Sequence, residues 1–309
     1  MKKIFIDGSA GTTGLKIVER LSNRKDIELI TLSEDLRKDI NARKDALNSC
    51  DISFLCLPDQ AAIEAVSLIE NPNAKVIDTS TAHRVNSEWA YGFPELSGKR
   101  EIIKNSSRIA NPGCHASGFI ALIAPLVENK VISEDVLLTS FSITGYTGGG
   151  KKMIAEYESA DRPSLFDAPR QYALTQKHKH LPEMTALCKL KNQPIFCPIV
   201  SDYDRGMEVT VPLFKQDING SVEDIKNLYN SLYNGKIVKY KESADESGLL
   251  SASSMRGRDD MEISVFGNED RILLVSRFDN LGKGASGSAI QNMNILLGVD
   301  ETTGLNLGE

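Results

Sequence analysis

One cysteine stands in a sequence context that favours nucleophilic chemistry. Cys114 follows the tripeptide Asn-Pro-Gly and precedes HASGFIALIAPLV, whose apolar residues recur at helical spacing. Because Pro and Gly break the preceding strand, a helix is expected to begin at or near the cysteine. The positive end of a helix dipole favours the thiolate, which is the reactive form. We therefore predict that Cys114 is a nucleophile, whereas Cys56 and Cys197 lie in strand-like apolar segments and are expected in the core.

A thiolate nucleophile usually works with a base, most often a histidine. The sequence has four histidines: His83, His115, His178 and His180. His115 adjoins the cysteine, but consecutive residues on a helix point about 100° apart. His178 and His180 come just before Pro-Glu, a dipeptide typical of the first turn of a helix. One of these two is the expected acid/base group, and the sequence does not decide which.

Three glycines near the amino terminus are spaced for phosphate binding. Gly8, Gly11 and Gly14 form G-x-x-G-x-x-G between an apolar strand-like run and a helical segment. Glycine lets the backbone approach a pyrophosphate, and the helix start supplies N–H donors, to which Thr12 and Thr13 add hydroxyls. The spacing differs from G-x-G-x-x-G, so a plain strand-to-helix turn is the alternative. The strand–loop–helix context favours a dinucleotide.

The residues after the second predicted strand bear on which dinucleotide binds. NAD-preferring folds usually carry an acidic residue there, which binds the ribose 2′-hydroxyl. Here Ser33 comes first and Arg37 and Lys38 follow, and a hydroxyl with cations suits a 2′-phosphate, so NADP is favoured. Glu34 or Asp35 could bind a ribose hydroxyl instead, and the two cations could lie on a solvated helix face.

Two different patterns of elements position these residues. Over roughly the first 110 residues, short apolar runs alternate with helical segments; the runs are 2–8, 26–32, 51–57 and 75–80. Such runs indicate a parallel sheet covered by helices on both faces. Later strands are longer and alternate more, which predicts a mixed or antiparallel sheet. This second part also contains an amphipathic helix at 222–234, a polar loop at 243–260 and a last helix within 284–298.

Composition narrows the class of protein. A chain of 309 residues suggests two domains, and a net charge of −6 disfavours a general nucleic-acid binder. No apolar run reaches the roughly 18 residues of a membrane helix, and the opening segment is not a secretion signal. The five cysteines are scattered without a CxxC pair. A reduced, cytoplasmic compartment with no disulfide framework and no metal site is therefore expected.

Motifs along the whole chain resemble one enzyme family. GSAGTTG, VIDTSTAHR, YGFPEL, ANPGCHASG, TGYTGGGKKMI, HKHLPEM and DNLGKGASGSAIQNMN stand in the order of the N-acetyl-gamma-glutamyl-phosphate reductases, and the chain is similar to their shorter subtype. The NPGCHAS and GYTGGGK blocks are specific to that family. The glycine loop and the NLGKGASG block are shared more widely, for example with aspartate-semialdehyde dehydrogenase. The chain has HKH where many members have HRH.

The resemblance implies an α/β fold with two domains. Residues 1–113 and 284–309 would form a Rossmann-type NADP-binding domain, completed by the C-terminal helix. Residues 114–283 would form an α+β catalytic and dimerisation domain with a mixed sheet. A homodimer or homotetramer and a place in arginine biosynthesis are implied as well.

The resemblance also implies roles for individual residues. Cys114 matches the family's nucleophile and His180 its acid/base histidine, with Glu183 as a helper. An acyl phosphate needs cations, for which Arg84 and Lys151 are the best candidates, although either could be a surface charge. The expected cofactor contacts are Gly8, Gly11, Thr12, Thr13, Gly14, Ser33, Arg37, Asn280, Gly282 and Gly284, and the expected substrate contacts are Arg84, Asn111, Gly148 and Lys151.

The expected reaction is the NADPH-dependent reduction of N-acetyl-gamma-glutamyl phosphate to the semialdehyde and phosphate, through a thioester on Cys114. Three alternatives remain at this point. The chain could act on aspartyl phosphate, or be a carrier-protein-linked reductase of lysine biosynthesis. It could also be a dinucleotide sensor without catalysis, but a sensor would not need Cys114, His180 and the TGGGK loop together.

Overall fold

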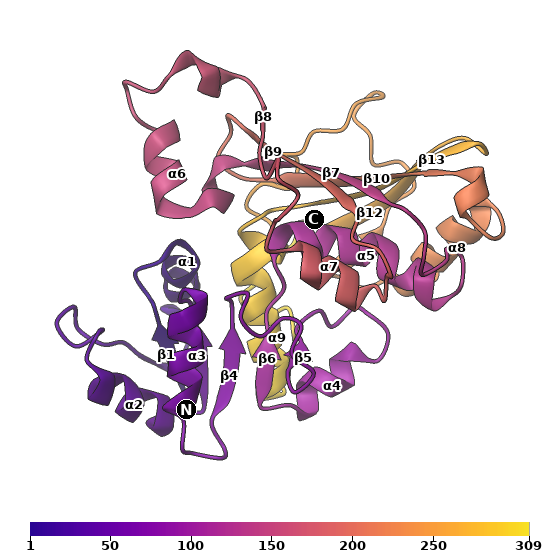
Figure 1. Ribbon diagram of the computed structural model, residues 1–309. Coiled ribbons are helices and arrows are strands. Elements are labelled where there is room, and N and C mark those ends of the chain that lie inside the picture. Colours follow the sequence, from indigo (N-terminus) through magenta and orange to yellow (C-terminus); the bar gives the residue numbers. More distant parts are fainter. Residues whose placement is uncertain (309) are drawn as a thin grey trace. The chain divides into compact units, whose positions relative to one another are not determined.

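The structure, a computed structural model that describes residues 1–308, consists of two compact units (Figure 1). The first contains residues 1–94, 98–112 and 285–305, and the second contains residues 95–97, 113–284 and 306–308. The predicted division gave 284–309 to the first domain; residue 309 lies outside the described residues. Residues 306–308 group with the second unit because the backbone of Asn306 hydrogen-bonds to Asp259.

The first unit is built on six parallel strands in the order β2-β1-β3-β4-β6-β5. The strands are β1 (Lys2–Asp7), β2 (Ile27–Ile30), β3 (Ile52–Leu55), β4 (Lys75–Asp78), β5 (Ala90–Tyr91) and β6 (Arg108–Ala110). This confirms the predicted parallel sheet. Since all strands run the same way, the loops that follow β1, β4 and β6 begin at the same edge, which is where open parallel sheets bind ligands.

Helices pack on both faces of this sheet. On one face, α1 (Thr12–Leu21), α4 (Lys99–Asn105) and α9 (Gly287–Leu297) contribute apolar side chains to a core with alternate strand residues, such as Ile4 and Phe54. On the other face, α2 (Ile40–Ser49) and α3 (Asp59–Ser67) pack on Phe5 and Val76. The last helix of the chain therefore packs in the first unit.

The second unit is built on a mixed sheet of seven strands in the order β11-β12-β13-β10-β7-β9-β8, which confirms the predicted type. The strands are β7 (Thr139–Gly145), β8 (Arg170–Gln171), β9 (Ile195–Ser201), β10 (Met207–Phe214), β11 (Val238–Tyr240), β12 (Met261–Gly267) and β13 (Arg271–Phe278). The β7–β9 and β11–β12 pairs are parallel and the other neighbours are antiparallel.

Helix α5 (Cys114–Glu128) packs on one face of the second sheet, against β10 and β13. It also contacts α7 (Leu181–Leu187) and α8 (Val222–Leu232). A Cβ added at Gly118 of α5 would lie only 2.5 Å from a methyl of Val209 in β10, so the helix approaches the sheet closely. The hydroxyls of Tyr229 and Tyr233 donate to carbonyls of α5 at 2.5 and 2.7 Å. The first residue of α5 is thereby held on a rigid support.

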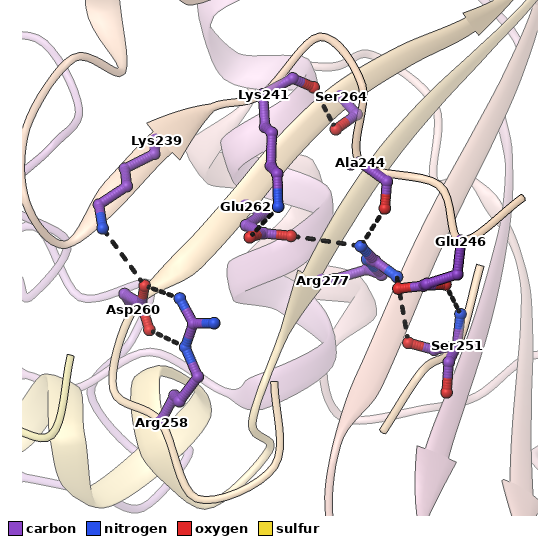
Figure 2. Close-up of polar contacts among 10 residues, drawn as sticks. All are labelled: Lys239, Lys241, Ala244, Glu246, Ser251, Arg258, Asp260, Glu262, Ser264 and Arg277. Atoms are coloured by element: carbon purple, nitrogen blue, oxygen red, sulfur yellow. Dashed lines mark hydrogen bonds and ion pairs between the residues drawn. The ribbon is translucent and has the colours of Figure 1, made fainter. Parts of the chain in front are cut away.

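The opposite face of this sheet carries buried charges at one end, shown in Figure 2. Arg277 of β13 is paired with Glu262 of β12, 3.3 Å away, and is almost fully buried. Its guanidinium also donates to the Ala244 carbonyl at 2.5 Å and to Glu246 at 2.6 Å. Both belong to the segment 243–260, which is irregular as expected. Arg277 therefore fastens this polar segment to the sheet.

Candidate active site

Cys114 is the first residue of α5. Gly113 is the N-cap residue, with an extended backbone, and the cysteine side chain is partly buried. The first N–H groups of a helix have no carbonyl partner within the helix, and together with the dipole they favour a thiolate at this position. The predicted helix start is therefore observed, while the nucleophilic role of Cys114 remains a prediction.

Glu183 contacts the backbone at the amino-terminal end of α5. Its side chain is buried and its Oε1 accepts a hydrogen bond from the Gly113 N–H at 2.9 Å. Glu183 lies in the first turn of α7, and His180 is the N-cap residue of the same helix. The start of α7 is thus fixed against the start of α5, which brings the HKHLPE segment to the cysteine's helix.

Three histidines form one cluster. The His115 ring lies 5.8 Å from the ring of His178 and 5.6 Å from that of His180, centroid to centroid, and the last two rings are 4.8 Å apart. The backbone N–H of His180 donates to His178 Nδ1 at 3.2 Å. Burial lowers the pKa of His115 to about 3 and that of His178 to about 4, so both are neutral at pH 7.

The imidazole of His115 is hydrogen-bonded at both nitrogens. Nδ1 lies 2.6 Å from the hydroxyl of Ser142 in β7, and Nε2 lies 2.7 Å from the hydroxyl of Tyr172. Burial raises the pKa of Tyr172, and the charge of Cys114 raises it further. The sequence argument set His115 aside because of its direction on the helix; in the structure its ring joins the histidine cluster through this network.

The turn between β13 and α9 packs against the cysteine. Asp279 is buried, and its carboxylate accepts hydrogen bonds from the backbone N–H groups of Leu281 and Gly282 at 2.7 and 3.1 Å. A Cβ added at Gly284 would lie 2.9 Å from the Cβ of Cys114. A larger residue at Gly284 would therefore press on the cysteine, whatever contact this glycine makes with a cofactor.

Asn280 connects two neighbouring loops of the second unit. Its Oδ1 accepts from the Gly206 N–H at 2.9 Å, and its Nδ2 donates to the Thr147 hydroxyl at 3.1 Å. Gly148 lies in the short helix Tyr146–Gly149, where an added Cβ would be 3.4 Å from Nδ2 of Asn280. Lys151 is exposed near the start of α6 (Gly150–Tyr157), a helix that the sequence did not predict.

The first unit has a cavity of about 540 Å³ at the glycine loop. Gly8, Ser9, Ala10 and Gly11 line it, so the backbone of the loop forms part of its wall. Gly8 has φ +83°, and an added Cβ would overlap the Cys56 carbonyl oxygen. Gly11 is the N-cap residue of α1, whose first residues are Thr12, Thr13 and Gly14. These features fit the predicted phosphate loop.

Cations line the same cavity. Arg37 and Lys38 are exposed, and Arg37 pairs with Glu34 at 2.7 Å. Ser33 is also exposed and follows Leu32, a lining residue. Arg43 is a lining residue that the sequence argument missed. It is buried, and its guanidinium pairs with Asp7 at 3.0 Å and with Glu64 at 2.9 Å.

Arg84 braces two loops of the first unit. Its guanidinium is buried and donates to the backbone carbonyls of Asn111 and Thr79, both at 3.0 Å. Asn111 is buried as well, and its Nδ2 donates to the Ala285 carbonyl at 3.1 Å. The loops that follow β4 and β6 are therefore tied together at the carboxyl edge of the sheet. Whether Arg84 and Asn111 bind substrate remains a prediction.

Two family descriptions match successive parts of the sequence. "Semialdehyde dehydrogenase, NAD binding domain" matches residues 3–106, and "Semialdehyde dehydrogenase, dimerisation domain" matches residues 114–280. Proteins of Brucella ovis and Brucella suis biovar 1, both named N-acetyl-gamma-glutamyl-phosphate reductase, are 45% identical over 306 residues, which cover 96% of this chain and 99% of theirs. The chain belongs to the N-acetyl-gamma-glutamyl-phosphate reductase family. The predicted resemblance is confirmed, and the protein is an oxidoreductase with a nicotinamide-dinucleotide-binding domain.

Solved structures share the fold of this reductase family at much lower identity. Aspartate semialdehyde dehydrogenase II of Vibrio cholerae superposes with a TM-score of 0.70 at 14% identity, covering 96% of this chain and 98% of the other. Aspartate semialdehyde dehydrogenase with NADP from Candida albicans gives 0.68 at 16% identity, with the same coverage. Within the described residues, none of the reductase's helices combines the length and hydropathy that crossing a membrane requires.

Sequence reasoning missed four residues around the reductase's two candidate sites: Arg43, His115, Ser142 and Tyr172. Arg43 lies on α2, whose weakly amphipathic sequence gave no helical signal. Ser142 lies at an inward-facing position of β7, in keeping with the alternation of the strand. Alternation does not reveal which polar group such a residue contacts. Tyr172 follows the two-residue strand β8, and nothing in the local sequence marks it. Only the tertiary structure connects His115, Ser142 and Tyr172, which all belong to the second unit.

Proposed function

We propose that this protein reduces N-acetyl-gamma-glutamyl phosphate to N-acetylglutamate semialdehyde and phosphate with NADPH, as a step of arginine biosynthesis. The observation that carries the proposal is Cys114 at the first position of α5, with Glu183 and His180 fixed there by α7. Relatives 45% identical over almost their whole length carry the corresponding name. This arrangement suits acyl transfer to sulfur followed by reduction.

Cys114 begins the reaction as a thiolate. Its sulfur attacks the acyl carbon, a C–S bond forms, and the bond from carbon to the phosphate oxygen breaks as phosphate leaves. N–H groups of the first turn of α5 stabilise the oxyanion. NADPH, when bound, supplies the hydride that reduces the thioester carbon. His180 protonates the resulting alkoxide and takes the proton back as the C–S bond breaks, which releases the aldehyde and restores the thiolate.

NADP is the proposed dinucleotide, for which the residues of the first unit are suited. The loop with Gly8 and Gly11 would bind the pyrophosphate, with Thr12, Thr13 and Gly14 at the start of α1. Arg37 and Lys38 line the cavity and would bind a 2′-phosphate, with Ser33 beside them. Asn280, Gly282 and Gly284 stay proposed as further cofactor contacts.

The substrate offers a phosphate and a carboxylate, both of which favour cations. Arg84 and Lys151 are the proposed cationic contacts, and Asn111 and Gly148 the proposed neutral ones. The role of Arg84 is supported by its guanidinium, which two backbone carbonyls hold in place. The role of Lys151 is supported by its exposure near the start of α6.

We also propose a homodimer or homotetramer that forms through the face of the second sheet that lies opposite α5, which we call the uncovered face. Phe141 of β7, Ile195 of β9 and Leu273 of β13 are 44%, 58% and 41% exposed on that face. The matching family description calls this part of the chain a dimerisation domain. A second copy of the chain is therefore the proposed occupant.

A substrate panel with the purified protein tests the function. We expect phosphate-dependent oxidation of N-acetylglutamate semialdehyde with NADP, at a kcat/KM at least tenfold above that with NAD, and loss of activity in Cys114→Ser. Alkylation and peptide mapping should locate the substrate-protected thiol at Cys114. Turnover of aspartate semialdehyde, but not of the N-acetylglutamate compound, would refute the substrate assignment. NADPH binding without any reduction would favour a sensor.

A further inference from the structure

The residue after the proposed nucleophile is a buried histidine with two hydrogen-bond partners. His115 joins β7 to the loop after β8, because Nδ1 bonds to Ser142 and Nε2 bonds to Tyr172. Both distances, 2.6 and 2.7 Å, are those of short hydrogen bonds. The proposed mechanism does not use this Ser142–His115–Tyr172 chain, which we call the relay.

The relay can be oriented in two ways. Since burial lowers the pKa of His115 to about 3, its imidazole is neutral at pH 7 and carries one N–H. In the first orientation, Ser142 donates to Nδ1, and Nε2–H donates to the oxygen of Tyr172. In the second, Tyr172 donates to Nε2, and Nδ1–H donates to the oxygen of Ser142.

Ser142 decides between the two orientations. Its side chain is buried on the sheet face that α5 covers, and within residues 1–308 its hydroxyl has no hydrogen-bond partner other than His115. In the second orientation the hydrogen of this hydroxyl would be buried without an acceptor, which is unfavourable. In the first orientation, the Ser142 hydroxyl donates this hydrogen to Nδ1 of His115. The geometry therefore favours the Nε2–H tautomer of His115.

The first orientation leaves the hydrogen of the Tyr172 hydroxyl directed away from His115. Tyr172 is only partly buried, and His115 is the one hydrogen-bond partner that the described residues give its hydroxyl. The negative charge of a Cys114 thiolate, after burial, raises the pKa of the Tyr172 phenol. His115 directly follows Cys114 on α5, so the Tyr172 hydroxyl is hydrogen-bonded to the neighbour of the residue that would carry the acyl group.

We propose that Tyr172 is a catalytic hydrogen-bond donor to the oxygen of the acyl group on Cys114, and that Ser142 and His115 are positioning residues that direct its hydroxyl there. The inference rests on the proposed function and adds a side-chain donor to the N–H groups of α5. The acyl oxygen gains negative charge when sulfur or hydride adds to the carbon, so a fixed donor stabilises the transition state more than the ground state. Hydrogen bonds in a chain polarise one another, so the relay strengthens this donor.

Two substitutions and two matched controls test the proposal. Tyr172→Phe removes the donor, and Ser142→Ala removes the group that orients His115. Tyr240→Phe removes a hydroxyl of β11 that is buried and has no hydrogen-bond partner within residues 1–308. Ser140→Ala removes, from the same strand as Ser142, a buried hydroxyl that also lacks a partner among these residues. Thermal unfolding and NADPH-binding titrations establish that each variant is folded.

We expect Tyr172→Phe to lower kcat by about 10²- to 10³-fold with little change in KM, as when one oxyanion donor is removed. Ser142→Ala should lower kcat by about tenfold or more, and Ser142→Thr, which keeps the hydroxyl, should restore it. The double variant should be no slower than Tyr172→Phe alone, since both substitutions act on one donor. Tyr240→Phe and Ser140→Ala should be within about twofold of the wild type.

A measurement without substrate tests the relay itself. In protein labelled with ¹⁵N-histidine, NMR should show His115 as the Nε2–H tautomer, assigned by comparison with His115→Gln. The Nδ1–H tautomer, a Tyr172→Phe variant within threefold of wild-type kcat, or independent effects of the two substitutions would each overturn the proposal. Failure of the proposed function would appear differently, as a wild-type enzyme that does not reduce the acyl phosphate although His115 has the expected tautomer.

Discussion

The environment of Cys114 is defined by backbone contacts on two sides. Glu183 accepts the N–H of the residue before it, and Gly284 leaves just enough room beside its Cβ. Neither contact is visible in the local sequence around the cysteine. The position of the sulfur therefore depends on two distant segments of the second unit, α7 and the turn before α9.

Gly284→Ala should impair the reaction without preventing folding. The new Cβ would lie 2.9 Å from the Cβ of Cys114, so one of the two must move by a few tenths of an ångström or more. Displacing a reacting group in this way lowers kcat by about 10²-fold. Steady-state kinetics against Gly235→Ala, where a Cβ meets nothing closer than 4.0 Å, gives the matched control. Equal kcat in the two variants would contradict the expected crowding.

His115, which is buried, and His178, which is partly buried, should make stability depend on pH. The pKa values of His115 and His178 are about 3 and about 4 in the folded protein, below the unfolded value near 6.5. The unfolded chain therefore binds more protons below pH 6.5, and the free energy of unfolding falls as pH falls, by up to about 1.4 kcal/mol per pH unit for each imidazole. Urea unfolding from pH 7 to pH 4.5 should show a shallower decline for His178→Gln than for the wild type. Parallel curves would contradict the neutral state of His178.

At the scale of elements, a charged cluster orders a segment that has no regular structure. Arg277 connects β13 to β12 and to the polar segment 243–260 (Figure 2). A buried guanidinium is tolerated there because carboxylates and a carbonyl surround it. Two interior strands of the sheet and the segment 243–260 are therefore fastened to each other.

Arg277→Met should destabilise the second unit strongly. The substitution removes the buried cation from Glu262, which keeps an ion pair with the partly exposed Lys241. Breaking a buried pair costs about 3–5 kcal/mol. Adding Glu262→Gln should recover part of the loss, because the stranded carboxylate is neutralised. Arg256→Met, which removes an exposed partner of Asp204, should change the free energy of unfolding by less than about 1 kcal/mol. Urea unfolding of the three variants decides; equal losses in the two arginine variants would contradict the argument.

Much of this element plan could be predicted from the sequence, and the exceptions have physical reasons. The glycine loop, α5 and the start of α7 were predicted because caps, turns and apolar periodicity are local signals. Helix α2 was missed because its sequence is only weakly amphipathic and gives little helical periodicity. Helix α6 was missed because it begins at Gly150, in a run of glycines that indicated a loop. Tyr172 and Ser142 could not be found, since their roles depend on contacts between distant segments.

At the scale of the whole molecule, the proposed assembly rests on the face of the second sheet that lies opposite α5. Phe141, Ile195 and Leu273 are 41–58% exposed on this face in the single chain. An exposed apolar patch of this kind is typical of an interface. The first unit has no comparable face among its described strands, because helices pack on both sides of its sheet. Assembly is therefore expected to involve the second unit.

Phe141→Glu combined with Leu273→Glu should dissociate the proposed oligomer. Each change places a charge in the apolar centre of the face, where burial on association would be unfavourable. Sedimentation at micromolar concentration should show the wild type as a dimer or tetramer and the double variant as a monomer with unchanged circular dichroism. Leu165→Glu combined with Leu174→Glu, at two positions that are 75% and 74% exposed, provides a control with the same change of charge. A monomeric wild type, or an oligomer that survives both substitutions, would contradict the proposed interface.

The order of the two units along the chain limits how the protein can be recombined with its relatives. Helix α9 packs in the first unit, although the entire second unit separates it from β6 in the sequence. A chimaera that exchanges dinucleotide-binding units between two such reductases therefore needs at least two junctions, at 112/113 and 284/285. A single crossover would combine a sheet from one parent with the covering helix of the other.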